Sequence, residues 1–593
     1  MPKIEVNEQL FHNLVGRRWE KREEFEEALT CAKAELDEDS DKSLPAAERI
    51  LKIELNDTNR PDLWSTAGCA RQLRVHSGGS YPAYPFFSRE GAGKQAGKEA
   101  GKEAADQGSG AFRVVVDPAL KDIRPYIAAF VVTGKPIDEE TLKDIIQTQE
   151  KLCWNYGRKR RSIAMGVYRT SLMKWPVHYS AADPDKTAFV PLGMDEKLSL
   201  REMLSKHPKG QEYGHIVADF KKFPYLADDA GETLSFPPVI NSARIGAVEV
   251  GDGELFVEMT GTDLESLTLA ASMVACDFAD LGYSIKSVRV EYPYDTPFGR
   301  SVTFPYYFQK PTFCSLARVK RFLGEELSAA ECVAAVQRMG CHAEAATEAE
   351  KGETAVLPGL RVYPAEYRND FLHAADVVED VMIGRMMKNF APLQPRDFTI
   401  GRLTPITSFS RKAKESLIGL GYQEMIYNYL GSGKDFVEKM RGDGSRIIRI
   451  VNPMSENFEY VRDSILPCLM MSESVSGNAV YPHRIFEVGK VAYRDDTENY
   501  GVKTRQHLGF LHSSADANFN VVSSQLQAVF YYLSRDYAVK ASDDARFIPG
   551  RAAAIMHKGE RIGVFGELHP ELLENWGVTM PCTAAEFDLD ALL

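Results

Sequence analysis

The chain has 593 residues, a hydrophobic content of 44% and a formal net charge of −13. These values exclude a disordered or fibrous protein, and the length predicts several domains of about 150 residues each. The acidic surplus argues against a free-standing nucleic-acid binder, which is usually basic. A local basic strip or a partner subunit could still supply phosphate contacts.

The start of the chain and the cysteines bear on where the protein works. The first residues, MPKIEVNEQL, show no basic stretch followed by an apolar run, and no window approaches the ~20 apolar residues of a membrane helix. The nine cysteines form no CxxC pair and are odd in number. A disulfide framework or zinc site is therefore not expected, and we predict a cytoplasmic protein without a membrane partner.

Residues 1–150 are expected to form an N-terminal α+β module. Ile53 and Leu55 alternate with polar neighbours, as in a half-buried strand, and the stretch 63–73 has helical spacing. Residues 77–110 interrupt this module with a Gly/Ala/Lys/Glu repeat that has no large apolar side chain after Phe87. Such a segment cannot bury enough surface to offset its ordering entropy, so we expect a disordered insertion without a binding role.

Residues 151–300 are expected to form a second α+β domain. A helix over 139–156 leads into four consecutive cations, Arg158 to Arg161. These cations could contact phosphate, but a solvated helix end, where cations suit the helix dipole, is the simpler explanation. Further along, residues 254–260 alternate as a strand, and an apolar helix follows Thr262-Asp263-Leu264-Glu265, which has the form of a capping box.

Two more regions complete a multidomain α+β fold. Residues 303–390 are expected to form a small helical or winged module, with a capping box at Ser328-Ala329-Ala330-Glu331 and a helix over 371–388. Residues 400–593 alternate helices and strands over a span long enough for a domain of their own.

Five stretches of the chain, in this order, resemble the beta subunits of phenylalanyl-tRNA synthetases. They read NDTNRPDLWSTAGCARQLR; GRKRRSIAMGVY; LSFPPVINS with FVEMTGTD; RVYPAEYRNDFLHAADVVEDVMIG; and NPMSENFEYVRDSILP with RIFEVGKV and GVFGELHPELLENWGV. Any one of them is weak evidence, but all five in this order are specific. Without an N-terminal OB-fold or a C-terminal anticodon-reading extension, the chain is similar to the shorter form typical of archaea and eukaryotes.

The resemblance implies a subunit of phenylalanine–tRNA ligase in an (αβ)₂ heterotetramer. The alpha subunit would bind ATP and phenylalanine and charge tRNA(Phe), and this chain alone would not aminoacylate. Residues 400–593 resemble a class II synthetase domain, an antiparallel sheet with helices. A working class II site needs arginines against the ATP phosphates. The corresponding segments, 485–490 and 563–570, offer Glu and His instead. We therefore expect a catalytically inactive domain, with His569 as a capping or packing residue.

Four carboxylates suggest a metal site in the small module. Asp376, Glu379 and Asp380 are spaced i, i+3, i+4 and share one helix face, and Asp370 lies just before that helix. A hard divalent cation would relieve their repulsion, although acidic residues often crowd an exposed helix face. The resemblance implies that 303–390 is a B5-type module and that Mg²⁺ is the cofactor, with Asp370, Asp376, Glu379 and Asp380 as its ligands.

The 151–300 region resembles the family's editing domain, a tRNA-binding B3/B4-type unit that hydrolyses tyrosine mischarged on tRNA(Phe). An apolar pocket rejects an added hydroxyl only weakly, whereas a second site that hydrogen-bonds the hydroxyl can select it. Asn241, Thr260, Thr262 and Asp263 lie in the two matching motifs and are the editing candidates. Thr262 and Asp263 could instead simply cap a helix. The sequence shows no nucleophile with a paired base, which fits hydrolysis by a positioned water helped by the substrate.

Two other functions remain open at this point. One is an RNA-binding scaffold that has lost editing, and the other is an independent aminoacyl-ester hydrolase. Hydrolysis of Tyr-tRNA(Phe) by the isolated chain distinguishes them. The net charge of −13 weighs against strong unaided tRNA binding and ranks both below the subunit hypothesis.

Overall fold

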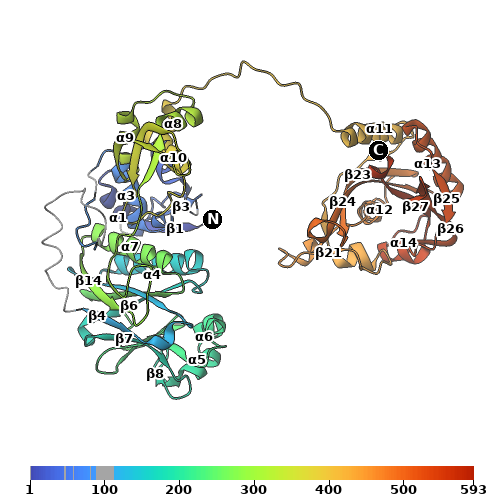
Figure 1. Cartoon of the computed structure of the whole chain (residues 1–593). Helices are drawn as coiled ribbons and strands as arrows, with labels where there is room; N and C mark the ends of the chain where they lie inside the picture. The colour runs from blue at the N-terminus through green and yellow to red at the C-terminus, as the bar shows by residue number, and fades with distance from the viewer. Residues whose placement is uncertain (1, 46–47, 58, 80–81, 89–111) are drawn as a thin grey trace. The chain divides into compact units, whose positions relative to one another are not determined.

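The computed structural model describes residues 2–45, 48–57, 59–79, 82–88 and 112–593. The chain divides into two compact units, residues 1–393 and 394–593 (Figure 1). The second unit therefore begins slightly before residue 400, the expected start of the last domain. Among the described residues, no helix combines the length and apolar character that crossing a membrane requires.

A three-stranded antiparallel sheet opens the first unit, in the order β1-β3-β2. Ile53 and Leu55 on β3 are fully buried, which confirms the predicted strand. The elements of this module are β1 (Lys3–Asn7), α1 (Glu8–Val15), α2 (Arg22–Leu29), β2 (Ala34–Glu38), β3 (Ile50–Leu55) and α3 (Thr66–His76). Helix α3 is buried along most of its length, and its Ser65 cap accepts a hydrogen bond from the backbone N–H of Gly68.

Part of the segment that follows α3 packs into the core. Tyr84 and Phe87 are buried in the core, and Ser88 forms a β-bridge with Tyr306. The prediction of disorder is therefore wrong for residues 82–88, whose aromatic side chains provide the apolar surface that the repeat lacks. Residues 77–79 follow directly on α3, and the rest of the predicted insertion, 80–81 and 89–110, lies outside the described residues.

The largest element of the first unit is a ten-stranded sheet, ordered β12-β11-β10-β7-β4-β14-β5-β13-β6, with β15 paired to β14. Its strands are β4 (Arg113–Val116), β5 (Tyr126–Thr133), β6 (Ile163–Arg169), β7 (Val177–Ala182), β10 (Phe223–Ala227), β11 (Thr233–Phe236), β12 (Ile240–Asn241), β13 (Glu254–Gly261), β14 (Ser284–Glu291) and β15 (Ser301–Phe304). The predicted boundary at 150/151 is wrong, because β4 and β5 pair inside this sheet with strands distant in sequence.

Helices and a small hairpin accompany this sheet. Helix α7 packs against β5, β13 and β14 and also against α3 of the N-terminal module. The remaining elements are α4 (Glu139–Lys151), β8 (Ala188–Phe189), β9 (Leu198–Ser199), α5 (Leu200–Lys206), α6 (Pro208–Tyr213) and α7 (Leu264–Asp280). Beyond α4 the helix widens into a π-helical turn over Leu152–Tyr156, just before the four cations.

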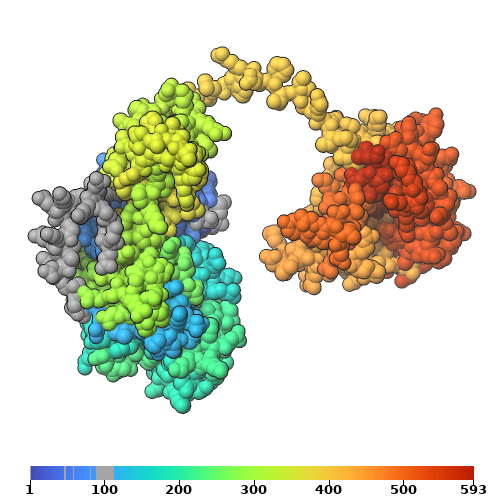
Figure 2. Space-filling view, viewed as in Figure 1, coloured from blue at the N-terminus to red at the C-terminus, as the bar shows by residue number. Residues whose placement is uncertain are grey.

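The small module of the first unit has the three-stranded sheet β16-β18-β17. Its elements are β16 (Thr312–Ser315), α8 (Leu316–Leu323), α9 (Ala329–Arg338), β17 (His342–Ala349), β18 (Val356–Tyr363) and α10 (Ala374–Arg385). The capping box of α9 is confirmed: Ser328 and Glu331 bond reciprocally. One continuous hydrophobic core runs through all three modules of this unit. Figure 2 shows the first unit as one packed body.

The second unit is built on the seven-stranded sheet β19-β23-β24-β28-β27-β26-β25, antiparallel except at β19. Its elements are α11 (Pro405–Gly419), β19 (Gln423–Glu424), β20 (Leu430–Gly431), β21 (Ile448–Arg449), β22 (Tyr460–Val461), α12 (Leu466–Val475), β23 (His483–Arg494), β24 (Val502–Ser513), α13 (Phe519–Leu533), β25 (Ala538–Ala541), β26 (Phe547–His557), β27 (Glu560–Leu568), α14 (Pro570–Trp576) and β28 (Cys582–Asp588). Side chains of this sheet and of these helices together form two buried apolar clusters. This is the antiparallel architecture expected from the sequence.

Candidate functional site

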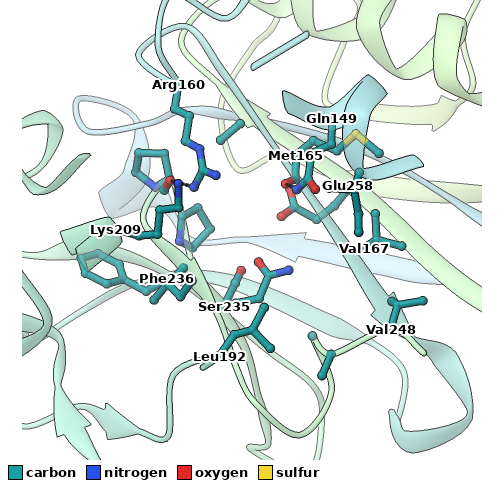
Figure 3. A pocket seen from close by; sticks show the side chains of 18 of the residues that line it. Gln149, Arg160, Met165, Val167, Leu192, Lys209, Ser235, Phe236, Val248 and Glu258 are labelled. Carbon is teal, nitrogen blue, oxygen red and sulfur yellow. Dashed lines mark hydrogen bonds between the residues drawn. The ribbon is translucent and has the colours of Figure 1, made fainter. Parts of the chain in front are cut away.

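A pocket of about 320 Å³ lies in the first unit, between α4, strands β6, β11 and β13, and the loop after β12 (Figure 3). This volume is in the usual range for a small-molecule site. Most of its wall is apolar. The polar side chains that line it are Gln149, Arg160, Lys209, Ser235, Asn241 and Glu258. Arg160 and Lys209 lie on one side, and Glu258 faces them from across the pocket.

Glu258 is the most unusual residue of this pocket. It points inward from β13, is only 3% exposed, and its Oε2 has no hydrogen-bond partner among the described residues. Its Oε1 lies 2.8 Å from the hydroxyl of Tyr168, which lies 2.8 Å from Ser235 Oγ. Gly166 leaves the necessary room, since a Cβ there would come within 2.6 Å of Glu258 Oε1. One carboxylate oxygen is thus held by the protein, and the other is free.

The environment of Glu258 disfavours its charge. Burial raises the pKa of this carboxyl to about 7, against smaller opposing effects of the Tyr168 hydrogen bond and the Arg124 charge. Near neutral pH the group therefore exchanges between a carboxylate that accepts hydrogen bonds and an acid that can donate one. Buried carboxyls with such values are frequent at functional sites.

The structure separates the four predicted editing residues. Asn241 lines the pocket. Thr260 is buried outside it, where its hydroxyl accepts a hydrogen bond of 3.0 Å from Arg124 Nε. Thr262 and Asp263 lie in the wall of a neighbouring cleft. Asp263, rather than Thr262, caps α7 by accepting from the backbone N–H of Ser266 at 3.1 Å. The capping explanation is therefore confirmed for Asp263.

Sequence reasoning missed Glu258, because the alternation along β13 predicts that this side chain is exposed. Along β13, Phe256, Glu258 and Thr260 share one side of the strand, and Leu255, Val257 and Met259 share the other. Only the second side is apolar in sequence, but in the structure both sides are buried from Leu255 to Gly261. Buried carboxylates are rare unless they are paired or functional.

The carboxylates of the small module do not gather into one site. Asp370 and Asp380 both bind the buried guanidinium of Arg368, at distances of 2.6 to 3.1 Å. Asp376 accepts from the backbone N–H groups of Leu372 and His373 and so caps α10. The guanidinium of Arg368 therefore compensates the negative charges of Asp370 and Asp380. The carboxylate of Asp376 is occupied by hydrogen bonds from the backbone.

The fourth carboxylate has a partner in another module. Glu379 forms an ion pair of 2.8 Å with Lys33, which also contacts Asp57. No group of three or more His, Cys, Asp or Glu side chains placed to hold a metal exists among the residues that the structure describes. The four predicted ligands therefore do not fit Mg²⁺ in this chain by itself, because its coordination requires oxygens that converge on one point.

In the second unit, segments 485–490 and 563–570, where the sequence offers Glu and His in place of the expected arginines, have structural partners. Glu487 on β23 is buried and forms a bidentate ion pair with Arg462, at 2.7 and 2.8 Å. His569 accepts from the backbone N–H of Glu571 at the start of α14, which confirms the predicted cap. Both side chains are thus committed to contacts within the domain.

A polar cavity of about 940 Å³ lies on the same unit. Several of its charged groups pair with one another: Arg546 with Asp544 at 2.8 Å, and His507 with Glu586 at 2.7 Å. These contacts occupy two of the basic side chains in the wall of the cavity.

Two family models match the chain. Residues 312–385 match the tRNA synthetase B5 domain, and residues 393–589 match the CLM domain of the phenylalanyl tRNA synthetase beta chain. A small B5 module and an antiparallel synthetase-type sheet in one chain define the class: the chain is a component of an aminoacyl-tRNA synthetase.

Full-length relatives narrow this class. Phenylalanine–tRNA ligase beta subunits from Treponema pallidum subsp. pallidum and Borreliella burgdorferi are 43% and 42% identical, each match covering 100% of both chains. A crystal structure of an N-terminal fragment of the phenylalanyl-tRNA synthetase beta subunit from Pyrococcus horikoshii has a TM-score of 0.55 and 33% identity, covering 65% of this chain and 99% of the fragment. The chain belongs to the family of phenylalanine–tRNA ligase beta subunits.

Proposed function

We propose that this chain, as the beta subunit of phenylalanine–tRNA ligase, hydrolyses tyrosine from mischarged tRNA(Phe) in the pocket around Glu258. The free, buried Oε2 of Glu258 in a largely apolar pocket is the observation that carries the proposal. The apolar wall suits an aromatic ring, and the carboxyl suits a phenolic hydroxyl. Phenylalanine would leave the carboxyl unpaired, which costs about 1–3 kcal/mol. That cost corresponds to a preference for tyrosine over phenylalanine of about 5- to 150-fold.

Hydrolysis in this pocket would use a water molecule rather than a side-chain nucleophile. The described residues that line the pocket include no histidine and no cysteine, and the only serine, Ser235, is hydrogen-bonded to Tyr168. Arg160 and Lys209 lie opposite Glu258, where a bound tyrosine would place its ester group. Fixed cations there can stabilise the negative charge that develops on the ester carbonyl.

The second unit is proposed to be inactive in aminoacylation. Its two replaced motifs make internal contacts through Glu487 and His569, and its polar cavity contains internal ion pairs. Binding of ATP and phenylalanine is then left to the alpha subunit of an (αβ)₂ tetramer, and this chain supports the charging of tRNA(Phe) without performing it.

Exposed apolar side chains on the second unit support a partner subunit. Among the most exposed are Ile426, Val451, Met454, Val475 and Val480, which are between 82% and 98% exposed. Burial of such side chains against a partner subunit would remove their apolar surface from water. We assign these side chains to contacts with the alpha subunit.

The nine cysteines are all free and buried, which supports a reducing, cytoplasmic location.

The experiment that tests editing replaces the carboxyl in the reconstituted complex. Glu258→Met keeps the approximate volume and removes both oxygens, and Glu254→Met, at the exposed start of the same strand, is the matched control. The ratio of deacylation rates for Tyr-tRNA(Phe) over Phe-tRNA(Phe) should fall by about 5- to 150-fold only for Glu258→Met. Charging with phenylalanine should not change. An unaltered ratio would contradict the role of Glu258.

The same assay separates the two alternatives. A scaffold that has lost editing predicts no deacylation by the parent complex. An independent hydrolase predicts full deacylation by this chain without the alpha subunit. The proposed function predicts deacylation by the complex and a marked loss when the alpha subunit is omitted, because the acidic chain alone binds tRNA weakly.

A further inference from the structure

Arg124 lies in the interior of the first unit, behind the wall of the pocket rather than in it, and is 2% exposed. Its three hydrogen bonds all end on neutral oxygens. Nε donates to the hydroxyl of Thr260 at 3.0 Å, Nη2 to the carbonyl of Thr260 at 2.6 Å, and Nη1 to the carbonyl of Arg161 at 2.9 Å. No carboxylate of the described residues forms an ion pair with this guanidinium.

This lack of a counter-charge distinguishes Arg124 from the other buried arginines. Of the five arginines that are less than 3% exposed in the described part of the chain, four pair directly with carboxylates: Arg60, Arg71, Arg368 and Arg462. Burial lowers the pKa of the Arg124 guanidinium, but arginine remains protonated in proteins. A buried, unpaired charge is costly, so its persistence calls for an explanation.

The charge of Arg124 lies beside Glu258. Thr260, which the guanidinium contacts, and Glu258 share one side of β13 and are two residues apart, a spacing of roughly 7 Å along the strand. A nearby opposite charge favours the ionised form of a carboxyl. Arg124 therefore opposes the effect of burial, which raises the pKa of Glu258 to about 7.

Other groups around Glu258 contribute less charge near neutral pH. Burial raises the pKa of Cys153 to about 11 and also raises the pKa values of the two tyrosines, so all three stay neutral. Arg160 and Lys209 are half-buried, and solvent screens their charges more than that of Arg124. The titratable and charged side chains that face Glu258 among the described residues are Arg124, Cys153, Arg160, Tyr168, Tyr179 and Lys209.

The same guanidinium also holds the loop with the four cations. Residues 158–160 all have left-handed φ values, between 50° and 64°, which side chains other than glycine and asparagine avoid. Such backbone persists where the surrounding structure over-determines it. Here Arg124 binds the carbonyl of Arg161, and Arg160 donates through Nη1 to the carbonyl of Val239 at 3.0 Å. The loop that carries Arg160 is thus anchored from two sides.

We infer that Arg124 is a positioning residue of the pocket: its unpaired charge keeps Glu258 in the carboxylate form that accepts the hydroxyl of a bound tyrosine, while its Nη1 anchors the loop of Arg160. The inference rests on the proposed editing function. A hydrogen bond from a phenol to a carboxylate is charge-assisted and about twice as strong as a neutral one. Phenylalanine has no hydroxyl to donate. The preference for tyrosine should therefore follow the ionised fraction of Glu258.

Two substitutions of Arg124 separate its charge from its hydrogen bonds in the complex with the alpha subunit. Arg124→Lys keeps the charge but loses the three-way fork, and Arg124→Met loses both. The readout is the ratio of kcat/KM for deacylation of Tyr-tRNA(Phe) over Phe-tRNA(Phe) between pH 5.5 and 8.5. This ratio cancels the pH dependence that hydrolysis of both esters shares.

In the parent complex the ratio should rise with pH, with a midpoint near 7. Arg124→Met should raise this midpoint by about 1 pH unit, the lower end of the effect of one close opposite charge. Arg124→Lys should keep the midpoint of the parent. A purely structural role would lower the rates of both variants without moving either midpoint.

A second pair of variants keeps Arg124 in place, in case its replacement prevents folding. Thr260→Asp puts a carboxylate against the guanidinium and should raise the midpoint as Arg124→Met does. Thr260→Asn has nearly the same shape without the charge and should leave the midpoint unchanged. Melting temperatures and gel filtration with the alpha subunit report folding and assembly.

Failure of the inference is distinguishable from failure of the editing function. If the parent deacylates Tyr-tRNA(Phe) and its midpoint is shared by Arg124→Met and Thr260→Asp, the inference is overturned and editing stands. Equal shifts in Arg124→Lys and Arg124→Met also overturn it. If the parent does not deacylate, editing fails, and the control of Glu258 by Arg124 is decided by stability. The pH dependence of the melting temperature that Glu258→Gln removes should then move upward in Thr260→Asp but not in Thr260→Asn, and identical profiles would refute that control.

Discussion

Arg71 donates a hydrogen bond through Nη1 to Oδ2 of Asp280 at 2.6 Å and so joins α3 to the end of α7. The same guanidinium contacts Asp277 at 3.2 Å and lies 4.0 Å from the ring centre of Tyr367 in the small module. Arg71 is 1% exposed. One buried cation therefore links the three modules of the first unit.

Replacing this cation should destabilise the whole first unit. Arg71→Gln leaves the buried Asp277 without its counter-charge and removes one of the two cations that pair with Asp280, and breaking a buried pair in this way costs about 3–5 kcal/mol. Arg74→Gln is the control, because Arg74 is more exposed and pairs only with Asp280, at 3.2 Å. Urea unfolding of the full chain, followed by tryptophan fluorescence, should show an earlier first transition for Arg71→Gln only. Equal midpoints would show that the junction is not held by Arg71.

Glu258 should make stability depend on pH. Its pKa is raised in the folded chain to about 7 from the ordinary 4.5, so the folded state binds the proton more tightly. The associated stability is fully present below pH 4.5 and is lost as pH rises through 7. Glu258→Gln cannot ionise, so its melting temperature relative to the parent should increase between about pH 5 and pH 8. A constant difference across this range would show that Glu258 does not titrate there.

The segment after α3 should tolerate deletion only in part. Removal of residues 90–110, a low-complexity repeat, should leave the thermal midpoint and assembly unchanged. Removal of 77–110 should lower both, because it also takes away the buried Tyr84 and Phe87. Truncating a buried Phe to Ala costs about 3–5 kcal/mol, so Phe87→Ala should reproduce most of the loss. Equal midpoints for the two deletions would contradict the ordered state of 82–88.

The carboxylates of the small module should act through Arg368 rather than through a metal. Asp380→Asn removes one of the two partners of a buried guanidinium and should lower stability by about 3–5 kcal/mol. Asp376→Asn, which weakens only a helix cap, should cost about 1 kcal/mol. Millimolar Mg²⁺ should not shift the melting temperature of the isolated chain. A clear shift that Asp376→Asn with Glu379→Gln abolishes would establish the metal site after all.

The isolated chain should form no phenylalanyl-adenylate. The segments that replace the ATP-binding motifs carry Glu487 and His569, and both side chains have internal partners. Pyrophosphate exchange with phenylalanine and ATP should therefore remain at background. Exchange by a preparation that mass spectrometry shows to lack the alpha subunit would refute the inactive assignment.

The sequence predicts local elements well, because their signals are local. Alternation marks β3 and β13, and the pair Ser328 and Glu331 marks the start of α9. Such signals could not predict that the domain boundary does not lie at 150/151. Strands β4 and β5 belong to the ten-stranded sheet because they pair with strands far along the chain, such as β13 and β14. Which distant strands pair is a property of the whole chain.

For the functional residues, too, the sequence predicts local features but not contacts between distant segments. Spacing placed Asp376, Glu379 and Asp380 on one helix but could not show that Arg368 lies between Asp370 and Asp380. Thr260→Val, which the sequence suggests as a test of hydroxyl recognition, would instead remove one of the three acceptors of Arg124. The left-handed loop at Arg158 carries no glycine at its left-handed positions to mark it. These features depend on contacts between segments, which residue spacing does not contain.

Arg124 has a consequence for the dimensions of the pocket. It donates to the side chain and carbonyl of Thr260 on β13 and, through Nη1, to the carbonyl of Arg161 in the loop with the four cations. The strand that carries Glu258 and the loop that carries Arg160 are therefore joined by one rigid side chain. Hydrogen bonds of Arg124 therefore hold the spacing between these two sides of the pocket, and under the proposed function this spacing would set the length of the side chain that fits.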